Sequence, residues 1–190
     1  MNLGPARLFL GIETHHDVTW ISLGQKACIT IIFRQFRMEH THGVAMPMNL
    51  NVKLDLAEDQ GEKKLDNITD NQAVMESLMY LATQPDISCS VAALSGNDSW
   101  PFTSHMTTAK WVLQCLKSTA DFCLHVNYNG IDINIGNSLV GYSDSAWANN
   151  SANRKSQGGH MFPASNGAIS GQSRKQSLIA MSILKAEFIA

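Results

Sequence analysis

The chain has 190 residues, of which 44% are hydrophobic and 16% charged, so it can build one or two cores and is not a disordered tail. With 14 basic and 16 acidic side chains its formal net charge is -2, which excludes a strongly basic, histone-like binder. No apolar run approaches the roughly 18 residues of a membrane span, and no signal peptide opens the chain. We therefore expect a soluble intracellular protein, cytoplasmic or nuclear, with no membrane partner.

A β-hairpin and a helix are the first predicted elements. Residues 8–14 indicate a strand and residues 18–23 alternate apolar with polar side chains, so the chain is expected to turn at His15-His16-Asp17. Residues 25–38 predict a helix because their apolar side chains recur at helical spacing. The residues on this face are Ile29, Ile32, Phe33 and Phe36.

A polar segment and three further helices follow. Residues 51–70 contain six acids and three lysines, which is typical of a solvated linker. Residues 72–82 predict a helix, and Asp86 is the expected cap of a second one after Pro85. The third helix is expected to begin at Thr103 or Ser104 and to bury an apolar stripe. This stripe comprises Met106, Ala109, Val112, Leu113 and Leu116.

The pattern changes to that of strands after Gly130. Strands are predicted over residues 131–135, 139–144, 159–162 and 168–170, with a turn at Asn166-Gly167. A last helix is expected to begin after Ser182 and to carry Glu187. The sequence therefore predicts a mixed α/β (α+β) fold.

Charge is distributed unevenly along the chain. Residues 1–142 carry 9 basic and 14 acidic side chains, whereas residues 143–190 carry 5 basic and 2 acidic ones. The two acids of the second segment are Asp144 and Glu187, and both lie among apolar or small residues. Because of this asymmetry, residues 143–190 are the first candidate region for catalytic side chains.

Several ordered motifs give the sequence a family resemblance. Leu3-Gly4-Pro5-Ala6, Phe9-Leu10-Gly11-Ile12-Glu13, Ser77-Leu78-Met79-Tyr80-Leu81-Ala82, Pro85-Asp86-Ile87 and Leu116-Lys117-Ser118-Thr119 occur in the first part. Gly141-Tyr142-Ser143-Asp144-Ser145-Ala146-Trp147-Ala148, Arg154-Lys155-Ser156, Gly167-Ala168-Ile169-Ser170, Lys175-Gln176 and Ala186-Glu187-Phe188-Ile189-Ala190 occur in the second. In this order they resemble the Pol polyprotein of copia-type long-terminal-repeat retrotransposons, over essentially the whole chain.

The resemblance implies two domains. Residues 1–128 resemble the end of the reverse-transcriptase palm, its thumb and its connection region, with the polar linker at about 51–70. Residues 129–190 resemble the N-terminal half of a ribonuclease H domain, so the expected fold is a set of thumb and connection helices followed by a truncated ribonuclease H-like sheet. The implied partner is an RNA–DNA hybrid or another nucleic acid.

The implied site uses carboxylates and magnesium. Ribonuclease H cleaves the RNA strand of a hybrid with two divalent ions, which favour hard oxygen ligands. By resemblance, Asp144 and Glu187 are the catalytic residues and Mg²⁺ ligands of this chain. Judged without the family, each acid is more often a structural or surface residue.

The same resemblance predicts inactivity of the isolated chain. The family site needs further carboxylates beyond the first ribonuclease H helix, where this chain ends, and two carboxylates offset the repulsion of two Mg²⁺ ions poorly. The polymerase motif Tyr-x-Asp-Asp does not occur, and neither does a Gly-rich phosphate loop, so no small-molecule cofactor is expected. The chain also departs from the family at Ala146, Gly171 and Lys185, where an acid, a tryptophan and a glutamate are usual.

Four basic residues are candidates for nucleic-acid binding. Arg154, Lys155, Arg174 and Lys175 flank two predicted strands, where they could line a groove for phosphates or form an ordinary solvated charge pair at each strand end. The leading interpretation of the whole chain is a polyprotein fragment that processes RNA–DNA hybrid only as part of a longer polypeptide. The alternative is a catalytically silent element remnant that binds nucleic acid weakly and without sequence preference.

Overall fold

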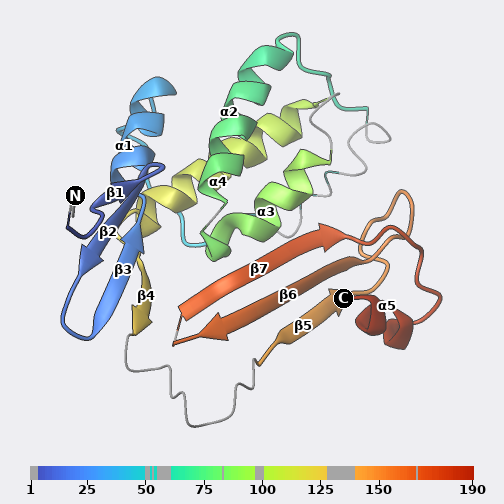
Figure 1. Cartoon of the computed structure of the whole chain (residues 1–190). Helices are drawn as coiled ribbons and strands as arrows, with labels where there is room; N and C mark the ends of the chain where they lie inside the picture. The colour runs from blue at the N-terminus through green and yellow to red at the C-terminus, as the bar shows by residue number, and fades with distance from the viewer. Residues whose placement is uncertain are drawn as a thin grey trace.

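The computed structural model describes residues 4–49, 52, 54, 61–82, 84–96, 101–127, 140–165 and 167–190, and their fold is mixed α/β (Figure 1). A first antiparallel sheet has the order β1-β2-β3-β4. Its strands are β1 (Leu8–Phe9), β2 (Ile12–His16), β3 (Trp20–Gly24) and β4 (Leu124–Asn127). The predicted hairpin is confirmed as β2 and β3, but its turn lies at residues 17–19, because His15 and His16 still pair with β3. Strand β4 joins the sheet from a hundred residues later in the chain.

The predicted strand over residues 8–14 is interrupted. It divides into β1 and β2 because Leu10 and Gly11 adopt positive φ angles of 47° and 71°, which extended chain does not tolerate. The Tyr80 hydroxyl donates a hydrogen bond to the Leu10 carbonyl and so holds this turn against the helices. A Cβ at Gly11 would overlap the same hydroxyl, which explains the glycine.

Four helices pack into the main hydrophobic core, above the second sheet in Figure 1. They are α1 (Lys26–Gln35), α2 (Ile68–Leu81), α3 (Pro85–Ser95) and α4 (Thr103–Thr119). The apolar faces predicted from helical spacing are buried here, with Leu78, Leu81, Ile87 and Leu116 fully inaccessible to solvent. Leu54, from the segment predicted to be a linker, is also part of this core.

Helix starts differ from the sequence expectations. Helix α2 begins at Ile68, inside the predicted linker and before residue 72, because the Asn67 side chain accepts a hydrogen bond from the Thr69 N–H at 3.1 Å. Asp86 does not cap α3: Gln84 occupies the cap position, Pro85 is the first helical residue, and Asp86 lies in the first turn.

The start of α4 is stabilised by side chains distant in sequence. We expected Thr103 or Ser104 to cap it, but Phe102 takes that position and the carboxylate of Glu62 accepts a hydrogen bond from the Ser104 N–H at 3.1 Å. The His105 ring Nδ1 accepts one from the Phe102 N–H at 3.0 Å. His105 is only 2% exposed, and its burial lowers its pKa more than the Glu62 charge raises it.

This histidine predicts a pH dependence of stability. Since the folded pKa of His105 lies below its unfolded value near 6.5, protonation favours the unfolded chain, and stability should fall as the pH decreases below about 6.5. Urea unfolding at pH 7.5 and 5.5 should show this loss, and His105→Gln should reduce it. Removing the exposed His40 by His40→Gln should leave it unchanged. An equal pH dependence in all three proteins would contradict this account.

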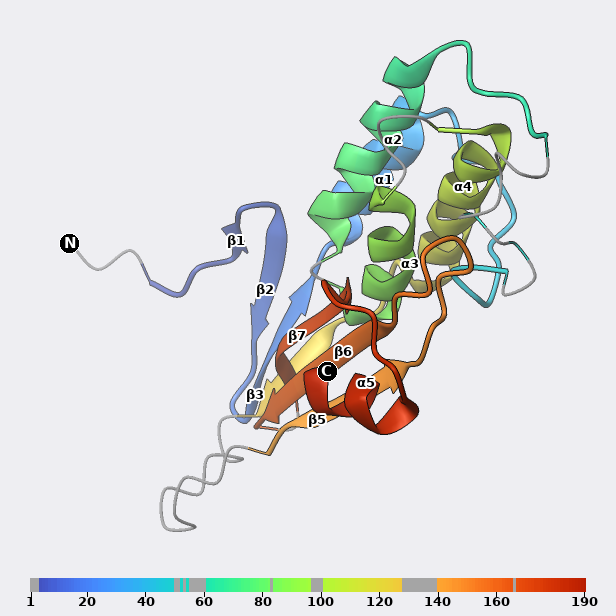
Figure 2. The same ribbon diagram turned by 90° about the vertical axis from the view of Figure 1, so that its right-hand side faces the viewer.

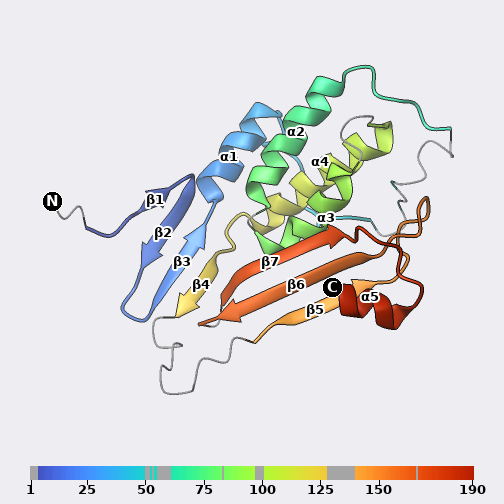
Figure 3. The ribbon, with the colours of Figure 1, turned by 45° about the vertical axis from the view of Figure 1, so that its right-hand side comes forward.

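The second sheet has the order β5-β6-β7 and is antiparallel throughout. Its strands are β5 (Tyr142–Ala146), β6 (Gln157–Ala164) and β7 (Gly167–Lys175), and helix α5 (Ile183–Ile189) follows. As predicted, Ser182 caps α5: its hydroxyl accepts a hydrogen bond from the Lys185 N–H at 3.2 Å. Helix α3 contacts β7, whereas α5 contacts β5 and lies away from the helical core (Figures 1 and 3).

The two sheets meet at the start of β7. The Asn127 N–H donates to the Ser165 carbonyl at 2.9 Å, and β4 contacts β7 directly. Gly167 lies against β4, because a Cβ there would be 2.6 Å from the carbonyl oxygen of His125. Figure 2 shows the two sheets next to each other, below the helices. The strand predicted over residues 131–135 and the boundary predicted at residue 128 lie outside the described residues.

Candidate functional site

Asp144 lies in the middle of the edge strand β5, opposite Gly159 of β6. It is exposed and borders a hollow of about 380 Å³ on the surface of the second sheet. The neighbouring Ser145 is buried, and its hydroxyl is 3.5 Å from the amide nitrogen of Gln176. Successive side chains of a strand point to opposite faces, so Asp144 projects from the face opposite to Ser145.

Glu187 lies half-buried on α5. This helix packs on the Ser145 side of the sheet, because the Gln176 side-chain amide also donates to the Ala186 carbonyl at 2.8 Å. The sheet face that carries Asp144 is therefore the face turned away from α5. The structure thus places strand β5, which carries Asp144, in contact with helix α5, which carries Glu187. The helix contacts the sheet face opposite to the one from which Asp144 projects.

A two-metal centre needs more ligands than the described residues provide together. Within the described ranges, no three His, Cys, Asp or Glu side chains come close enough to hold a metal ion. Because two Mg²⁺ ions repel each other strongly at short range, several anionic ligands are required. The donor set formed by the described residues does not fit such a centre, and the role of Asp144 and Glu187 as ligands stays a prediction.

The loop between β5 and β6 is held by several hydrogen bonds. The Ala148 N–H donates to the buried Ser156 hydroxyl at 3.0 Å, and the Arg154 N–H donates to the Asn150 carbonyl at 2.8 Å. The Trp147 indole donates to the Ala180 carbonyl at 2.9 Å. Trp147 therefore connects the end of β5 to the segment before α5.

The four candidate nucleic-acid-binding residues gather at one end of the second sheet. Arg154 and Lys155 are separated from the start of β6 by Ser156, and Arg174 and Lys175 pair with the first two residues of β6. Among the described residues, none of the four has a carboxylate partner within ion-pair distance. Arg174 and Lys175 are successive residues of a strand and point to opposite faces, so the cations surround the end of the sheet instead of lining one groove.

Gly171 lies on β7, at the position where the resemblance implies a tryptophan. It borders a hollow of about 430 Å³ between α3 and β7, lined also by Pro85, Ser88, Met161 and Gln172. A Cβ at Gly171 would approach the His160 carbonyl oxygen at 3.3 Å and otherwise meet little. A hollow therefore lies beside the position where the resemblance implies a large side chain.

Comparisons with known proteins find relatives over nearly the whole chain. It is 33% identical to a retrovirus-related Pol polyprotein from transposon TNT 1-94 of Nicotiana tabacum, across 100% of this chain and 14% of that protein. It is 32% identical to a retrovirus-related Pol polyprotein from transposon RE2 of Arabidopsis thaliana, across 95% of this chain and 12% of that protein. A secreted RxLR effector protein 161 of Plasmopara viticola is 35% identical across 60% of this chain and 78% of its own length.

No family model and no solved structure matches the chain. The two polyproteins nevertheless match the mixed α/β chain from the first sheet to the second, so it aligns with one segment of each of them. The chain belongs to the retrovirus-related Pol polyproteins of copia-type transposons and spans about one seventh of the length of these relatives. None of the helices in the described ranges has the length and apolar character that a bilayer-spanning helix requires.

Proposed function

We propose that this chain is the part of a copia-type polyprotein that runs from the end of the reverse transcriptase into the ribonuclease H domain. Within the longer polypeptide it would contact RNA–DNA hybrid and contribute Asp144 and Glu187 to Mg²⁺-dependent cleavage. The observation that carries this proposal is the match to two Pol polyproteins over 95–100% of the chain. The motif around Asp144 and the basic end of the second sheet support it.

We propose further that the isolated chain does not cleave hybrid. The described residues do not bring three metal-ligating side chains together, and only two acids follow residue 142. The chemistry would therefore require carboxylates from elsewhere in the longer protein. Asp144 would then be one ligand of a site assembled from more than one segment.

A catalytically silent remnant is the second candidate. The hollow beside Gly171 favours it, together with Ala146 and Lys185 at positions where acids are usual in the family. Asp144→Asn and Glu187→Gln separate the two candidates when introduced into a polyprotein that contains this segment. Loss of Mg²⁺-dependent activity supports the enzymatic role, and unchanged activity supports the remnant.

Hybrid binding through the basic end of the sheet gives a direct test. If these cations contact phosphates, Arg174→Gln/Lys175→Gln should weaken binding about threefold to tenfold and reduce the slope of log affinity against log salt by roughly 1 to 2. Fluorescence anisotropy with a labelled RNA–DNA hybrid measures both. The control Arg34→Gln/Lys110→Gln removes two exposed cations from helices α1 and α4 and should change neither. Equal effects of the two double variants would refute a localised interface.

A further inference from the structure

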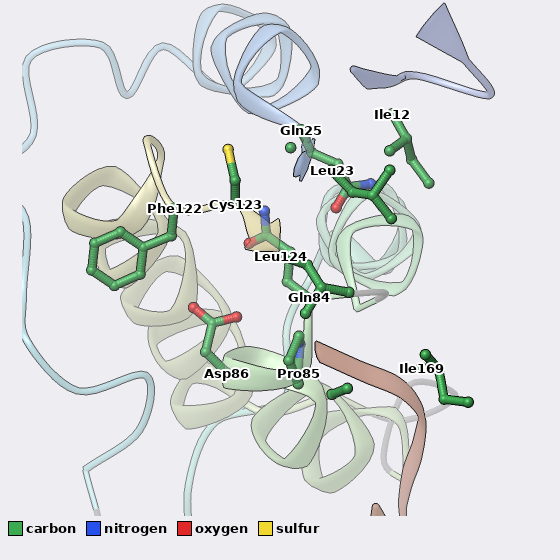
Figure 4. Close-up of a pocket in the computed structure, with 12 residues that line it drawn as sticks. Ile12, Leu23, Gln25, Gln84, Pro85, Asp86, Phe122, Cys123, Leu124 and Ile169 are labelled. Atoms are coloured by element: carbon green, nitrogen blue, oxygen red, sulfur yellow. The ribbon is translucent and has the colours of Figure 1, made fainter. Parts of the chain in front are cut away.

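A pocket opens where the first sheet, helix α3 and strand β7 meet (Figure 4). Its volume is about 340 Å³, which is within the range of small-molecule sites. Leu23 and Leu124 come from adjacent strands of the first sheet, Pro85 and Asp86 from the first turn of α3, and Ile169 from β7. The pocket therefore touches three parts of the fold that are remote in sequence.

Apolar side chains form most of the pocket wall. Leu23 and Leu124 are half-buried, while Phe122 and Ile169 are 66% and 56% exposed. Large apolar side chains that surround a concavity and remain exposed are typical of a binding site. An apolar group that entered this space would remove their surface from water, which favours binding.

Among the described residues of the pocket wall, Asp86 is the only acidic one, and it is exposed. Figure 4 shows its carboxylate directed from α3 toward the space between Phe122 and Leu124. Among the described residues it has no cation within ion-pair distance. Lys26, the basic residue next to the pocket residue Gln25, is instead paired with Asp121 at 2.5 Å. The pocket thus combines an apolar wall with a carboxylate that lacks a cation.

We propose that this pocket binds a small amphipathic organic cation, a primary arylalkylamine. The ammonium group donates hydrogen bonds to the Asp86 carboxylate, and the ring lies between the aliphatic side chains of Leu23, Leu124 and Ile169. The charge of the ligand determines the selectivity of the pocket. None of the described residues in the pocket wall is basic, so a bound anion would lie near the Asp86 carboxylate without a counter-ion. The proposal does not depend on nucleic-acid processing.

Tryptamine and indole-3-acetate form a matched pair of probes, because they share a ring system and carry opposite charges. Titrations of the ¹⁵N-labelled chain, followed by amide chemical shifts, should show tryptamine perturbing Leu23, Leu124 and Ile169. Its affinity should exceed that of indole-3-acetate by about threefold to tenfold, because the exposed Asp86 carboxylate attracts the cation and repels the anion. Equal affinities, or shifts confined to other regions, overturn the proposal.

Substitutions test whether the Asp86 carboxylate is the group that binds the ammonium of tryptamine. Asp86→Asn should weaken tryptamine binding about threefold to fivefold, the usual effect of losing a solvent-exposed ion pair. The matched control is Asp70→Asn, since Asp70 is the acidic residue in the first turn of α2 and lies outside the pocket; it should bind as the wild type does. Ile169→Lys, at an exposed position, introduces an ammonium group into the pocket wall and should abolish binding of a cation. Unchanged binding in Asp86→Asn or in Ile169→Lys refutes the assignment.

Discussion

Leu78→Ala is expected to lower the free energy of unfolding by about 3–4 kcal/mol, because removing a buried isobutyl group leaves a cavity that the neighbours fill only in part. Leu78 is 0% exposed and belongs to the core formed by α1, α2, α3 and α4. Urea unfolding followed by circular dichroism measures the change.

The adjacent Met79 supplies the control for that measurement. It lies on the same helix but is 57% exposed, so Met79→Ala should change the free energy of unfolding by less than about 0.5 kcal/mol. A loss below about 1 kcal/mol at Leu78, or equal losses at both positions, would show that this core does not stabilise the protein as described.

Gly167→Ala is expected to cost about 1–3 kcal/mol, the usual range for forcing extra volume into a packed site. The added Cβ would lie 2.6 Å from the carbonyl oxygen of His125 and 3.2 Å from a methyl carbon of Val126. A backbone carbonyl moves only with its strand, so β4 and β7 would have to separate. The two sheets would then lose the hydrogen bond between the Asn127 N–H and the Ser165 carbonyl.

Gly159→Ala is the matched control for this substitution. Gly159 lies on β6 in the same sheet, and a Cβ there would meet only the Gln172 carbonyl oxygen at 3.4 Å, an ordinary contact. Thermal unfolding should show a large decrease in melting temperature for Gly167→Ala and a small change for Gly159→Ala. Similar decreases in both would indicate a general intolerance of the sheet and contradict a specific contact with β4.

Periodicity was sufficient to predict the hairpin, the helical faces and the second sheet. These features depend on the alternation of neighbouring residues, which the sequence displays directly. Strands β6 and β7 extend beyond the predicted residues 159–162 and 168–170 because glycine and polar residues hide the alternation at their ends. Strand β4 was not predicted, since it has four residues and its partner β3 lies about a hundred residues earlier.

Interactions between distant segments account for the other differences. The cap of α4 includes Glu62, 42 residues before Ser104, and no local motif indicates such a pair. The sequence predicts Asp86 as the cap of α3, but Pro85 is already the first helical residue. Asp86 therefore lies in the first turn of α3, where it lines the pocket. The pocket itself consists of residues from five separate stretches of the chain, so no linear motif could have indicated it.

In the candidate site, too, local features could be predicted from the sequence, whereas features that depend on contacts between distant segments could not. The motif around Asp144 identified the strand, and the strand ends predicted for the basic residues place all four at one end of the sheet. The face on which Asp144 lies could not be predicted, because it depends on the packing of α5 against Ser145 through Gln176.

The central claim is that this segment contributes to a hybrid-cleaving site without forming a complete one. A Mg²⁺-dependent cleavage assay on a labelled RNA–DNA hybrid tests it most directly, with the purified chain shown to be folded by circular dichroism and Asp144→Asn as the control. We predict no cleavage by either protein above the background without enzyme. Cleavage by the wild-type chain that Asp144→Asn abolishes would contradict the account, because the present carboxylates would then be sufficient.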